Sequence, residues 1–291
     1  MTVRSVLLVH SAGDRDREYL RSPGEELQCD LGVLTVPEDV TPGTVLETHL
    51  GEPFEVREPR GPDLFDHFER TGAPMMPRDV GLIVGHTGVS AGDRVLDAGT
   101  GTGVLAAYLG RIGAGVVTYE RDPEFADVAR RNMRLAGVED RVDVRTGDLL
   151  DALDGPDALE DLAVAGADEA GPERTGQTET AGEGESTPGS ETAPERAHDA
   201  PRRGFDLLTL DTGDAAAIVE RAPELLVAGG FVAVYSPFVE QTRAAALAAR
   251  EAGLDPTTYE TIQREMDFGS RGSRPSTAGV GHTGYLTFAR N

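Results

Sequence analysis

The chain of 291 residues is long enough for one large hydrophobic core or two smaller ones, and its net charge is −24, from 51 acidic and 27 basic residues. All the basic residues are arginines, and the single cysteine, Cys29, excludes an intrachain disulfide and a multi-cysteine metal site. The histidines show no metal-ligand spacing, and no segment has the pattern of a signal peptide or of a membrane span. We therefore expect a soluble, cytoplasmic protein with no bound metal and no membrane contact.

The acidic composition also bears on the salt concentration in which the protein works. A chain this acidic, with few aromatic residues, is typical of a disordered or highly soluble protein. Clear strand and helix patterns argue against disorder of the whole chain. The remaining explanation is a cytoplasm with molar salt, where a dense carboxylate surface keeps a protein hydrated, so we hypothesise a halophilic source.

Residues 1–65 predict a small β-rich domain, and residues 66–291 a second, larger domain. Short β-rich runs alternate with turns that contain Gly, Pro and Asp, a spacing typical of a small antiparallel barrel or sandwich. These runs are Val3–His10, Leu31–Val36, Thr44–His49 and Phe54–Val56. The domain contains no catalytic cluster, so we expect it to grip a partner or to shape an oligomer.

An amphipathic segment, Asp63–Thr71, leads into a loop that contains Pro74 and Pro77. The two prolines prevent a helix before Arg78, after which apolar residues return at helical spacing. The adjacent Met76 lies on this rigid loop near the predicted cofactor edge. Core packing and substrate contact are both open interpretations for it.

A strand, a glycine-rich turn and a helix follow one another from Arg94 to Ile112. The apolar strand runs up to Asp97, and glycines then occupy alternate positions, which lets the backbone turn sharply and approach a ligand. A strand that leads through a glycine turn into a helix is the nucleotide-binding arrangement of a doubly wound sheet. The next two strands, Gly115–Glu120 and Val142–Asp148, each end in an acid, and an acid after the second strand can accept hydrogen bonds from both ribose hydroxyls. The helix between them is predicted over Pro123–Ala136.

The glycine spacing distinguishes two candidate ligands. A dinucleotide site uses G-x-G-x-x-G, whereas this chain has G-x-G-x-G preceded by Asp97, which would repel a pyrophosphate and suit the ammonium group of a methionine moiety. The Asp-Ala-Gly-Thr-Gly-Thr-Gly loop resembles the first motif of class I methyltransferases, which implies an α/β Rossmann-like fold and S-adenosyl-L-methionine as cofactor. A Rossmann-like domain with another nucleotide is the alternative. The cofactor-binding residues that the resemblance implies are Asp97, Gly99, Thr100, Gly101, Thr102, Gly103, Val104, Glu120, Arg121, Asp148, Leu149 and Asp211.

The composition changes abruptly after the third strand of the core. Between Gly166 and Arg203 there is no Val, Ile, Leu, Met, Phe, Tyr or Trp. Nothing in such a segment can offset the entropy of ordering, so we predict a disordered, acidic insert over 154–203.

The remaining elements complete a seven-stranded sheet with an antiparallel last hairpin, as in class I methyltransferases. Pro223 is expected to kink or close the helix in which it lies. The predicted elements are the strand Phe205–Asp211, the helix Ala215–Leu226, the strand Gly229–Pro237, the helix Val239–Ala252, the strand Thr257–Met266, the polar, glycine-rich loop Asp267–Thr283 and the strand Gly284–Arg290.

Three stretches resemble the tRNA (adenine-N1)-methyltransferases that act in the T loop. They are Pro77–Gly81, Tyr235–Gln241, and Arg274–Pro275 together with Gly281–Arg290. The last is the most specific, because generic methyltransferases do not share it. The resemblance implies transfer of a methyl group from S-adenosyl-L-methionine to N1 of adenosine 58, adenosine 57 or both, a tRNA partner, a homotetramer and an archaeal source. The alternatives are a small-molecule or isoaspartyl-protein methyltransferase and a non-catalytic tRNA-binding subunit.

The resemblance implies that Asp211 is the catalytic residue. Adenine N1 is a weak nucleophile whose methylation leaves a cationic ring, and a carboxylate can stabilise the positive charge that develops in the transition state. The alternative role for Asp211 is a helix N-cap. The chain departs from the family in the next three residues, Thr212–Asp214, where prolines are usual. The candidates for RNA contact are Met76, Arg78, Arg274 and His282.

Overall fold

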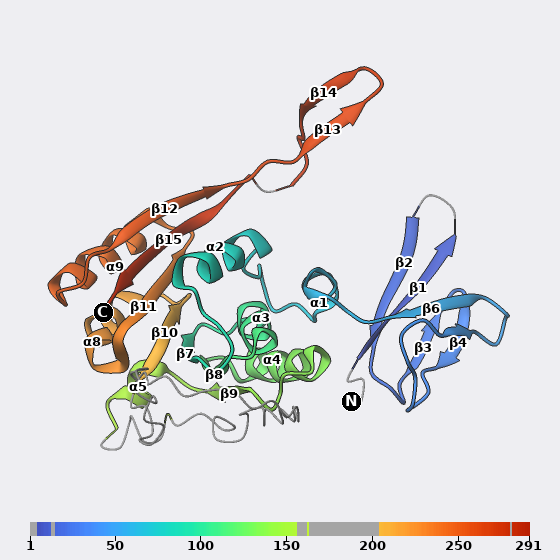
Figure 1. The fold of residues 1–291 in the computed structure, drawn as a ribbon, viewed down its shortest axis with the longest axis horizontal. Helices are drawn as coiled ribbons and strands as arrows, with labels where there is room; N and C mark the ends of the chain where they lie inside the picture. Colours follow the sequence, from blue (N-terminus) through green and yellow to red (C-terminus); the bar gives the residue numbers. More distant parts are fainter. Residues whose placement is uncertain (1–4, 13–14, 156–161, 163–203, 280) are drawn as a thin grey trace, which may run out of the picture.

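The computed structural model describes residues 5–12, 15–155, 162, 204–279 and 281–291. The predicted disordered insert, 154–203, lies outside the described residues except for Asp154, Gly155 and Leu162. Figure 1 shows a β-rich N-terminal region beside a larger body of strands and helices, from which a two-stranded hairpin projects.

One seven-stranded sheet organises the larger body. Its order is β12-β15-β11-β10-β7-β8-β9, and β15 is antiparallel to both of its neighbours, whereas the strands from β11 to β9 are parallel. This arrangement, with its reversed last strand, confirms the predicted class I methyltransferase fold. The strands are β7 (Arg94–Ala98), β8 (Gly115–Glu120), β9 (Val142–Thr146), β10 (Phe205–Leu210), β11 (Leu226–Ser236), β12 (Thr257–Ile262) and β15 (His282–Arg290).

The central strands are apolar on both faces, so neighbouring residues pack into opposite cores. Val95 and Val116 join one hydrophobic cluster, whereas the residues that follow them, Leu96 and Val117, join the other. Alternation of side chains along a strand produces this division, and helices on both faces cover it. The first cluster includes residues of α2 (Pro77–Thr87), α3 (Val104–Ile112) and α4 (Pro123–Ala136). The second includes residues of α5 (Leu149–Leu153), α7 (Ala215–Glu220), α8 (Ala222–Leu225) and α9 (Val239–Glu251).

Prolines decide several helix boundaries. Helix α2 begins at Pro77 rather than at Arg78 as predicted, because the first helical position needs no backbone N–H donor. The single helix predicted over Ala215–Leu226 is divided into α7 and α8, with Pro223 in the first turn of α8. Helix α5 was not predicted, because it has only 5 residues.

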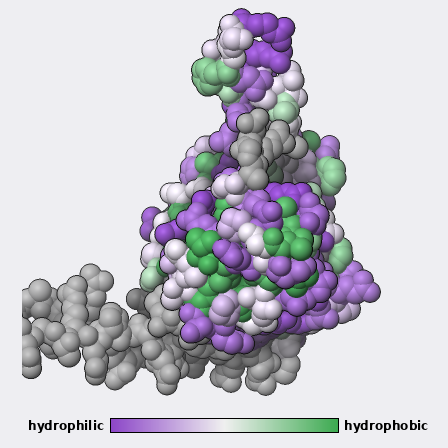
Figure 2. Space-filling model, turned by 90° about the vertical axis from the view of Figure 1, so that its right-hand side faces the viewer, coloured by the Kyte–Doolittle hydropathy of each residue, from purple (hydrophilic) through white to green (hydrophobic). Residues whose placement is uncertain are grey.

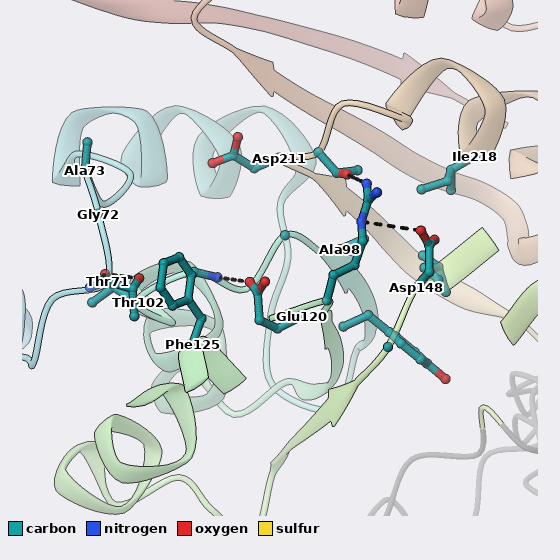
Figure 3. A pocket seen from close by; sticks show the side chains of 17 residues that line it. Thr71, Gly72, Ala73, Ala98, Thr102, Glu120, Phe125, Asp148, Asp211 and Ile218 are labelled. Carbon is teal, nitrogen blue, oxygen red and sulfur yellow. Dashed lines mark hydrogen bonds and ion pairs between the residues drawn. The ribbon is translucent and has the colours of Figure 1, made fainter. Parts of the chain in front are cut away.

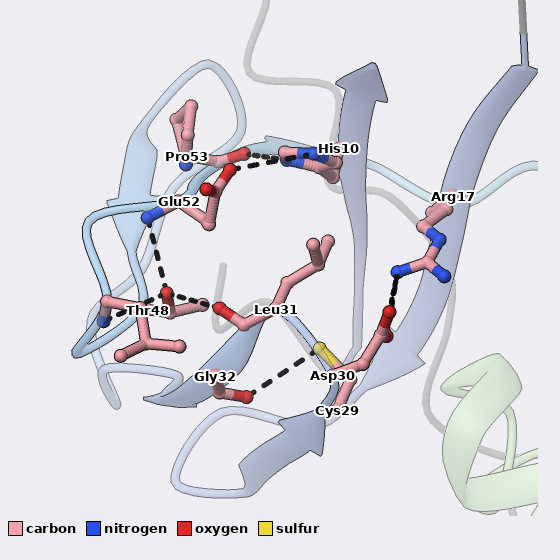
Figure 4. Close-up of polar contacts among 10 residues, drawn as sticks. His10, Arg17, Cys29, Asp30, Leu31, Gly32, Thr48, Glu52 and Pro53 are labelled. Carbon is pink, nitrogen blue, oxygen red and sulfur yellow. Dashed lines mark hydrogen bonds and ion pairs between the residues drawn. The ribbon is translucent and has the colours of Figure 1, made fainter. Parts of the chain in front are cut away.

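The N-terminal region has a hydrophobic core of its own around Phe54. A four-stranded sheet, β2-β1-β6-β5, and the hairpin β3–β4 enclose it. Side chains add contacts between these elements. His10 Nδ1 on β1 lies 2.8 Å from the carbonyl oxygen of Pro53 on β6, and Arg17 on β2 pairs at 2.7 Å with Asp30 in the turn of the β3–β4 hairpin (Figure 4). The strands are β1 (Val6–Ala12), β2 (Arg15–Arg21), β3 (Glu26–Cys29), β4 (Gly32–Thr35), β5 (Val45–Glu47) and β6 (Pro53–Arg57).

Helix α1 (Gly61–His67) packs with the larger body. Its Leu64 and the following Phe68 belong to the same cluster as the residues of α2 and α3. We therefore propose that the boundary between the two domains lies between β6 and α1, a few residues before position 65.

The predicted loop over Asp267–Thr283 is wrong in its first half. This segment forms most of a hairpin, β13 (Met266–Gly269) paired with β14 (Gly272–Pro275). Gly272, directly after the two-residue turn, has a φ of 127°. The hairpin projects from the body (Figure 2). It carries a hydrophobic side chain, Phe268, that is 81% exposed. Its polar, glycine-rich sequence gives no strand signal. Neither face of the hairpin is buried, so the sequence lacks the alternation of apolar and polar residues by which strands are recognised.

Candidate cofactor and substrate site

Glycines shape the loop between β7 and α3. Gly99, Gly101 and Gly103 have φ values of 93°, 52° and 81°, in the left-handed region that glycine favours. A Cβ atom on Gly99 would lie 2.0 Å from the carbonyl oxygen of Asp211, and one on Gly103 would lie 2.6 Å from Met133 Cε. The loop backbone therefore packs directly against the exit of β10 and against α4.

Asp97 lies buried beneath this loop. Its Oδ2 accepts a hydrogen bond from Thr118 Oγ1 and its Oδ1 one from Thr209 Oγ1, each at 2.5 Å. Burial raises the pKa of Asp97, while the two threonine hydrogen bonds act in the opposite direction. The carboxylate thus joins the ends of β7, β8 and β10 and brings negative charge close to the glycine loop.

Two adjoining cavities lie at the carboxyl edge of the parallel strands, where sites occur in open α/β sheets. The larger has a volume of 300 Å³, and Glu120, Asp148, Asp211 and Phe125 lie around it (Figure 3). The smaller has a volume of 40 Å³ and shares Gly99, Gly101 and Asp211 with the lining of the larger. All twelve residues predicted to bind the cofactor line one or both cavities, so the fold brings the whole predicted set together.

Backbone donors orient the acids at the ends of β8 and β9. Glu120 Oε2 accepts a hydrogen bond from the N–H of Gly101 at 2.8 Å, and Asp148 Oδ1 accepts one from the N–H of Leu150 at 2.8 Å as the N-cap of α5. Phe125, on the first turns of α4, adds an apolar wall that the sequence analysis missed. An exposed aromatic residue on an amphipathic helix that follows the second strand was the signal for it.

Asp211 is held at the junction of the two cavities. Its backbone N–H donates to the carbonyl oxygen of Ala98 at 2.8 Å, and its side chain reaches solvent through the cavity. Desolvation by the surrounding protein raises the pKa of Asp211 to about 7, and the negative charges of Asp97 and Glu120 add to the shift. The alternative role as a helix N-cap is wrong, because Asp214 occupies that position before α7.

The residues predicted to contact the substrate lie outside these two cavities. Met76 and Arg78 line a separate groove of 750 Å³, and Arg78 Nη1 donates to the carbonyl oxygen of Gln263 at 3.2 Å. Met75, rather than Met76, lines the smaller cavity. The other two candidates pair with acids: His282 lies 3.2 Å from Glu260, and Arg274, on the projecting hairpin, lies 3.7 Å from Asp267. Their contact with RNA remains a prediction.

Comparisons with known proteins identify the family. A family profile described as protein-L-isoaspartate(D-aspartate) O-methyltransferase matches residues 72–157, which include the glycine loop and the acids after β8 and β9 but not Asp211. Over 294 aligned residues the chain is 32% identical to the tRNA (adenine(57)-N(1)/adenine(58)-N(1))-methyltransferase TrmI of Methanocaldococcus jannaschii, an alignment that covers 98% of this chain and 94% of that protein. The chain belongs to the TrmI family.

Solved structures agree with the TrmI-family fold. The chain matches the tRNA (m1A58) methyltransferase TrmI of Aquifex aeolicus with a TM-score of 0.60 and 22% identity, over 99% of this chain and 97% of that one. It matches an S-adenosylmethionine-dependent O-methyltransferase of Thermotoga maritima with a TM-score of 0.66 and 23% identity, over 100% of this chain and 93% of that one. At these identities the two matches establish the fold.

The C-terminal segment that resembles the TrmI family has a structural role at the site. Tyr235 lines the smaller cavity and donates its hydroxyl proton to the carbonyl oxygen of Thr283 at 2.8 Å. A Cβ atom on Gly284 would lie 2.8 Å from the Tyr235 ring and 2.8 Å from the carbonyl oxygen of Ser236. Burial, followed by the charges of Asp79 and Asp211, raises the pKa of Tyr235 to about 12, so its phenol stays protonated. Gly284 therefore gives this tyrosine the room to lie against β15.

The described part of this TrmI-family chain shows neither a metal-binding cluster nor a membrane-spanning helix. Within that part, no group of three or more His, Cys, Asp and Glu side chains is arranged to hold a metal ion. The longest described helix, α4, has 14 residues, and neither it nor any other described helix could span a bilayer.

Proposed function

We propose that this chain transfers a methyl group from S-adenosyl-L-methionine to N1 of adenosine 58, adenosine 57 or both in the T loop of tRNA. The observation that carries the proposal is the convergence of three carboxylates, those of Asp97, Glu120 and Asp211, beside the glycine loop of a TrmI-family chain. A sulfonium and a methylated adenine both carry positive charge, which this negative site favours. The same site would repel the pyrophosphate of a dinucleotide.

The residues around the larger cavity suit the cofactor. Its volume of 300 Å³ is in the usual range for small-molecule sites. The nearest atoms to a Cβ built on Gly101 are 4.0 Å away, so the loop has an open side at which a ligand can approach the backbone. Glu120 would accept hydrogen bonds from the ribose hydroxyls, Asp148 would hold the adenine, and Phe125 would pack against its flat face. The cofactor itself supplies a methyl group activated by the positive sulfur.

Asp211 would act on the target base. Its carboxylate would accept a hydrogen bond from the exocyclic amino group of adenine and stabilise the positive charge that grows on the ring during transfer. The negative charges of Asp97 and Glu120, which also raise the pKa of Asp211, add to the negative potential at this point. The protein must also hold N1 in line with the methyl group, roughly 3–3.5 Å away, after the base has left the folded T loop.

The tRNA would contact the groove beside α2. Met76 and Arg78 line this groove, and His282 and Arg274 lie on the strands that continue from it. Attraction to phosphates weakens steeply as salt rises, so in the cytoplasm of a halophilic archaeon shape, stacking and arginine contacts would dominate.

A homo-oligomer, with a tetramer as the family resemblance implies, belongs to the same proposal. Strand β12 lies at the edge of the sheet, where its Ile262 is 63% exposed, and the hairpin beyond it exposes Phe268. An open strand edge can pair with another chain, and an isolated two-stranded hairpin is marginally stable in water. Contact with further copies of the chain would bury both features.

One assay tests the reaction, the site and the target together. Labelled S-adenosyl-L-methionine and unmodified tRNA would be incubated at molar potassium chloride with the wild-type chain and with Asp211→Ala, and with tRNAs in which adenosine 57 or 58 is replaced. We expect transfer that requires Asp211 and at least one of these adenosines. Transfer to an isoaspartyl peptide instead would support the alternative function, an isoaspartyl-protein methyltransferase. The match of residues 72–157 to the profile of that family favours this alternative. Cofactor binding without transfer to either substrate would indicate a non-catalytic subunit.

A further inference from the structure

The loop that follows Asp211 has few contacts of its own. Around the position of a Cβ on Gly213 there is no atom within 4 Å, so nothing packs on the middle of the loop. Asp214 precedes α7, but its side chain caps no backbone N–H of that helix. The backbone of the loop bonds at its start, where the N–H of Asp211 reaches Ala98, and at its end, where the N–H of Ala215 reaches the carbonyl oxygen of Thr212 at 3.3 Å.

One arginine from a different strand exit holds this loop. Arg121 directly follows β8, and its Nη2 donates both to Thr212 Oγ1, at 2.8 Å, and to Asp214 Oδ2. Its Nε lies 3.4 Å from Asp148 Oδ2, at the exit of β9. A single guanidinium thus joins the ends of three parallel strands at the edge of the larger cavity, between the acid predicted to hold adenine and the loop that carries Asp211.

The chemistry of the arginine side chain suits this role. A guanidinium is planar and presents its N–H donors in fixed directions, so it sets the direction as well as the distance of the groups that it binds. The Arg121 side chain is 53% exposed, and exposed ion pairs add little to the stability of a fold. Its effect therefore lies in where it holds the loop rather than in how much it stabilises the chain.

We propose that Arg121 is a positioning residue for methyl transfer. Its guanidinium fixes Thr212 and Asp214, and through them the Asp211 carboxylate, relative to Asp148 and the bound cofactor. The inference rests on the proposed function and gives Arg121 a role beyond the cofactor contact expected from the sequence. Displacement of a reacting group by about 1 Å can lower a rate by about 100-fold, so a small movement of this loop is enough to matter.

The test compares variants on the two sides of the contact. Arg121→Gln and Asp214→Ala, alone and together, would be assayed for kcat and KM with tRNA at saturating cofactor, for the Kd of S-adenosylhomocysteine, and for amide hydrogen exchange of residues 211–216. Arg121→Lys keeps the positive charge but loses the planar guanidinium with its fixed donor directions. Arg221→Gln is the matched control, because Arg221 also bridges two carboxylates, Glu224 at 3.0 Å and Asp154 at 3.4 Å, but lines neither cavity.

We expect kcat to fall about tenfold in Arg121→Gln and in Asp214→Ala, with no further loss in the double variant, because both remove the same contact. The loop amides should exchange faster in each, the Kd should change by less than about threefold, and Arg121→Lys should be intermediate. Arg221→Gln should match the wild-type chain in kcat and in exchange of the loop.

Three results would overturn the proposal. An unchanged kcat in Asp214→Ala, with a weaker Kd in Arg121→Gln alone, would reduce Arg121 to a cofactor contact. An equal loss of rate in Arg221→Gln would indicate a general effect of surface charge. If the wild-type chain transfers no methyl group to tRNA, the proposed function fails, and the exchange data alone then decide: unchanged protection of residues 211–216 in Arg121→Gln refutes the positioning role.

Discussion

The backbone of Asp211 lies directly against Gly99. A Cβ atom on Gly99 would be 2.0 Å from the carbonyl oxygen of Asp211 and 2.7 Å from its carbonyl carbon, both of which are backbone atoms that cannot rotate away. The first glycine of the loop and the residue proposed to carry catalysis are therefore placed by one contact. A substitution that shifts the backbone at Gly99 would therefore also shift Asp211, and the reverse holds.

Gly99→Ala should abolish methyl transfer and weaken cofactor binding at least tenfold, because the new methyl group must displace the exit of β10. The φ of 93° adds about 1–3 kcal/mol of backbone strain. Gly92→Ala is the matched control: Gly92 has a φ of 88° but no atom within 4 Å of its Cβ position. Thermal unfolding should show a larger loss of stability in Gly99→Ala than in Gly92→Ala, because only the former adds a backbone clash to the strain. Calorimetry with S-adenosylhomocysteine should show a loss of binding in Gly99→Ala only. Equal binding by both variants would contradict the argument.

The raised pKa of Asp211 predicts a pH-dependent cost in stability. Folding raises this pKa from 3.8 to about 7, so the folded chain binds more protons than the unfolded chain between these values, and stability falls as pH rises through this window. Asp211→Asn should therefore unfold at a higher urea concentration than the wild-type chain at pH 8. Since the side chain reaches solvent, we expect a gain on the order of 1 kcal/mol rather than the full shift. The gain should shrink steadily as the pH is lowered to 5, and a constant difference would refute it.

The same group predicts the pH dependence of the reaction. Asp211 must be ionised to stabilise a cationic base, so kcat/KM for S-adenosyl-L-methionine should fall as pH drops through about 7 in the free enzyme. The positive sulfonium lowers the pKa of a nearby carboxylate, so the midpoint for kcat should lie at a lower pH than that for kcat/KM. Initial rates from pH 5 to 9 at constant ionic strength measure both. Identical midpoints, or activity that does not change over this range, would show that Asp211 does not titrate as proposed.

Gly284 is predicted to be less tolerant than its neighbour Gly281. Gly284→Ala places a methyl group 2.8 Å from the Tyr235 ring, which should cost about 1–3 kcal/mol and shift the tyrosine at the smaller cavity. Gly281→Ala meets no atom within 4 Å and should be nearly neutral. Tyr235→Phe, which removes the hydrogen bond to Thr283, should cost about 0.5–1.5 kcal/mol. Urea unfolding of the three variants provides the measurement, and equal stability of the two alanine variants would contradict the close packing.

The exposed apolar side chains of β12 and the hairpin predict an effect on assembly. Ile262→Thr combined with Phe268→Ser should lower the oligomeric state measured by light scattering, because the variant loses the apolar surface that another copy would cover. Leu247→Ser removes an exposed apolar group from α9 and is the control. An unchanged mass in the first variant would remove this surface from the proposed interface.

Local patterns were enough to predict twelve residues that line the two cavities. The glycine spacing after β7 and the acids Glu120 and Asp148 follow strands that are recognisable from their own residues, and parallel strands bring their carboxyl ends to one edge. The partners of Arg121 were out of reach because Thr212 and Asp214 lie 91 and 93 positions away, and no periodicity links them.

Strand β2 was not predicted, for a different reason. Strand β2, Arg15–Arg21, has the sequence RDREYLR, which reads as a polar turn because an edge strand needs only one apolar face. Phe125 was missed although the sequence carries a signal: it is an aromatic residue outside the buried face of the amphipathic helix α4, and it lines the larger cavity.

The two described ends of the 155–204 connection, Gly155 and Gly204, line neither of the two cavities. Helix α5 leads from Asp148, at the carboxyl edge of the sheet, to Asp154, which pairs with Arg221 after the last turn of α7. The chain re-enters at Gly204, whose carbonyl oxygen accepts a hydrogen bond from Arg94 at the first residue of β7, at the opposite edge. A fluorescent protein or an affinity tag inserted between these two ends would therefore be joined to the body at points outside the lining of both cavities.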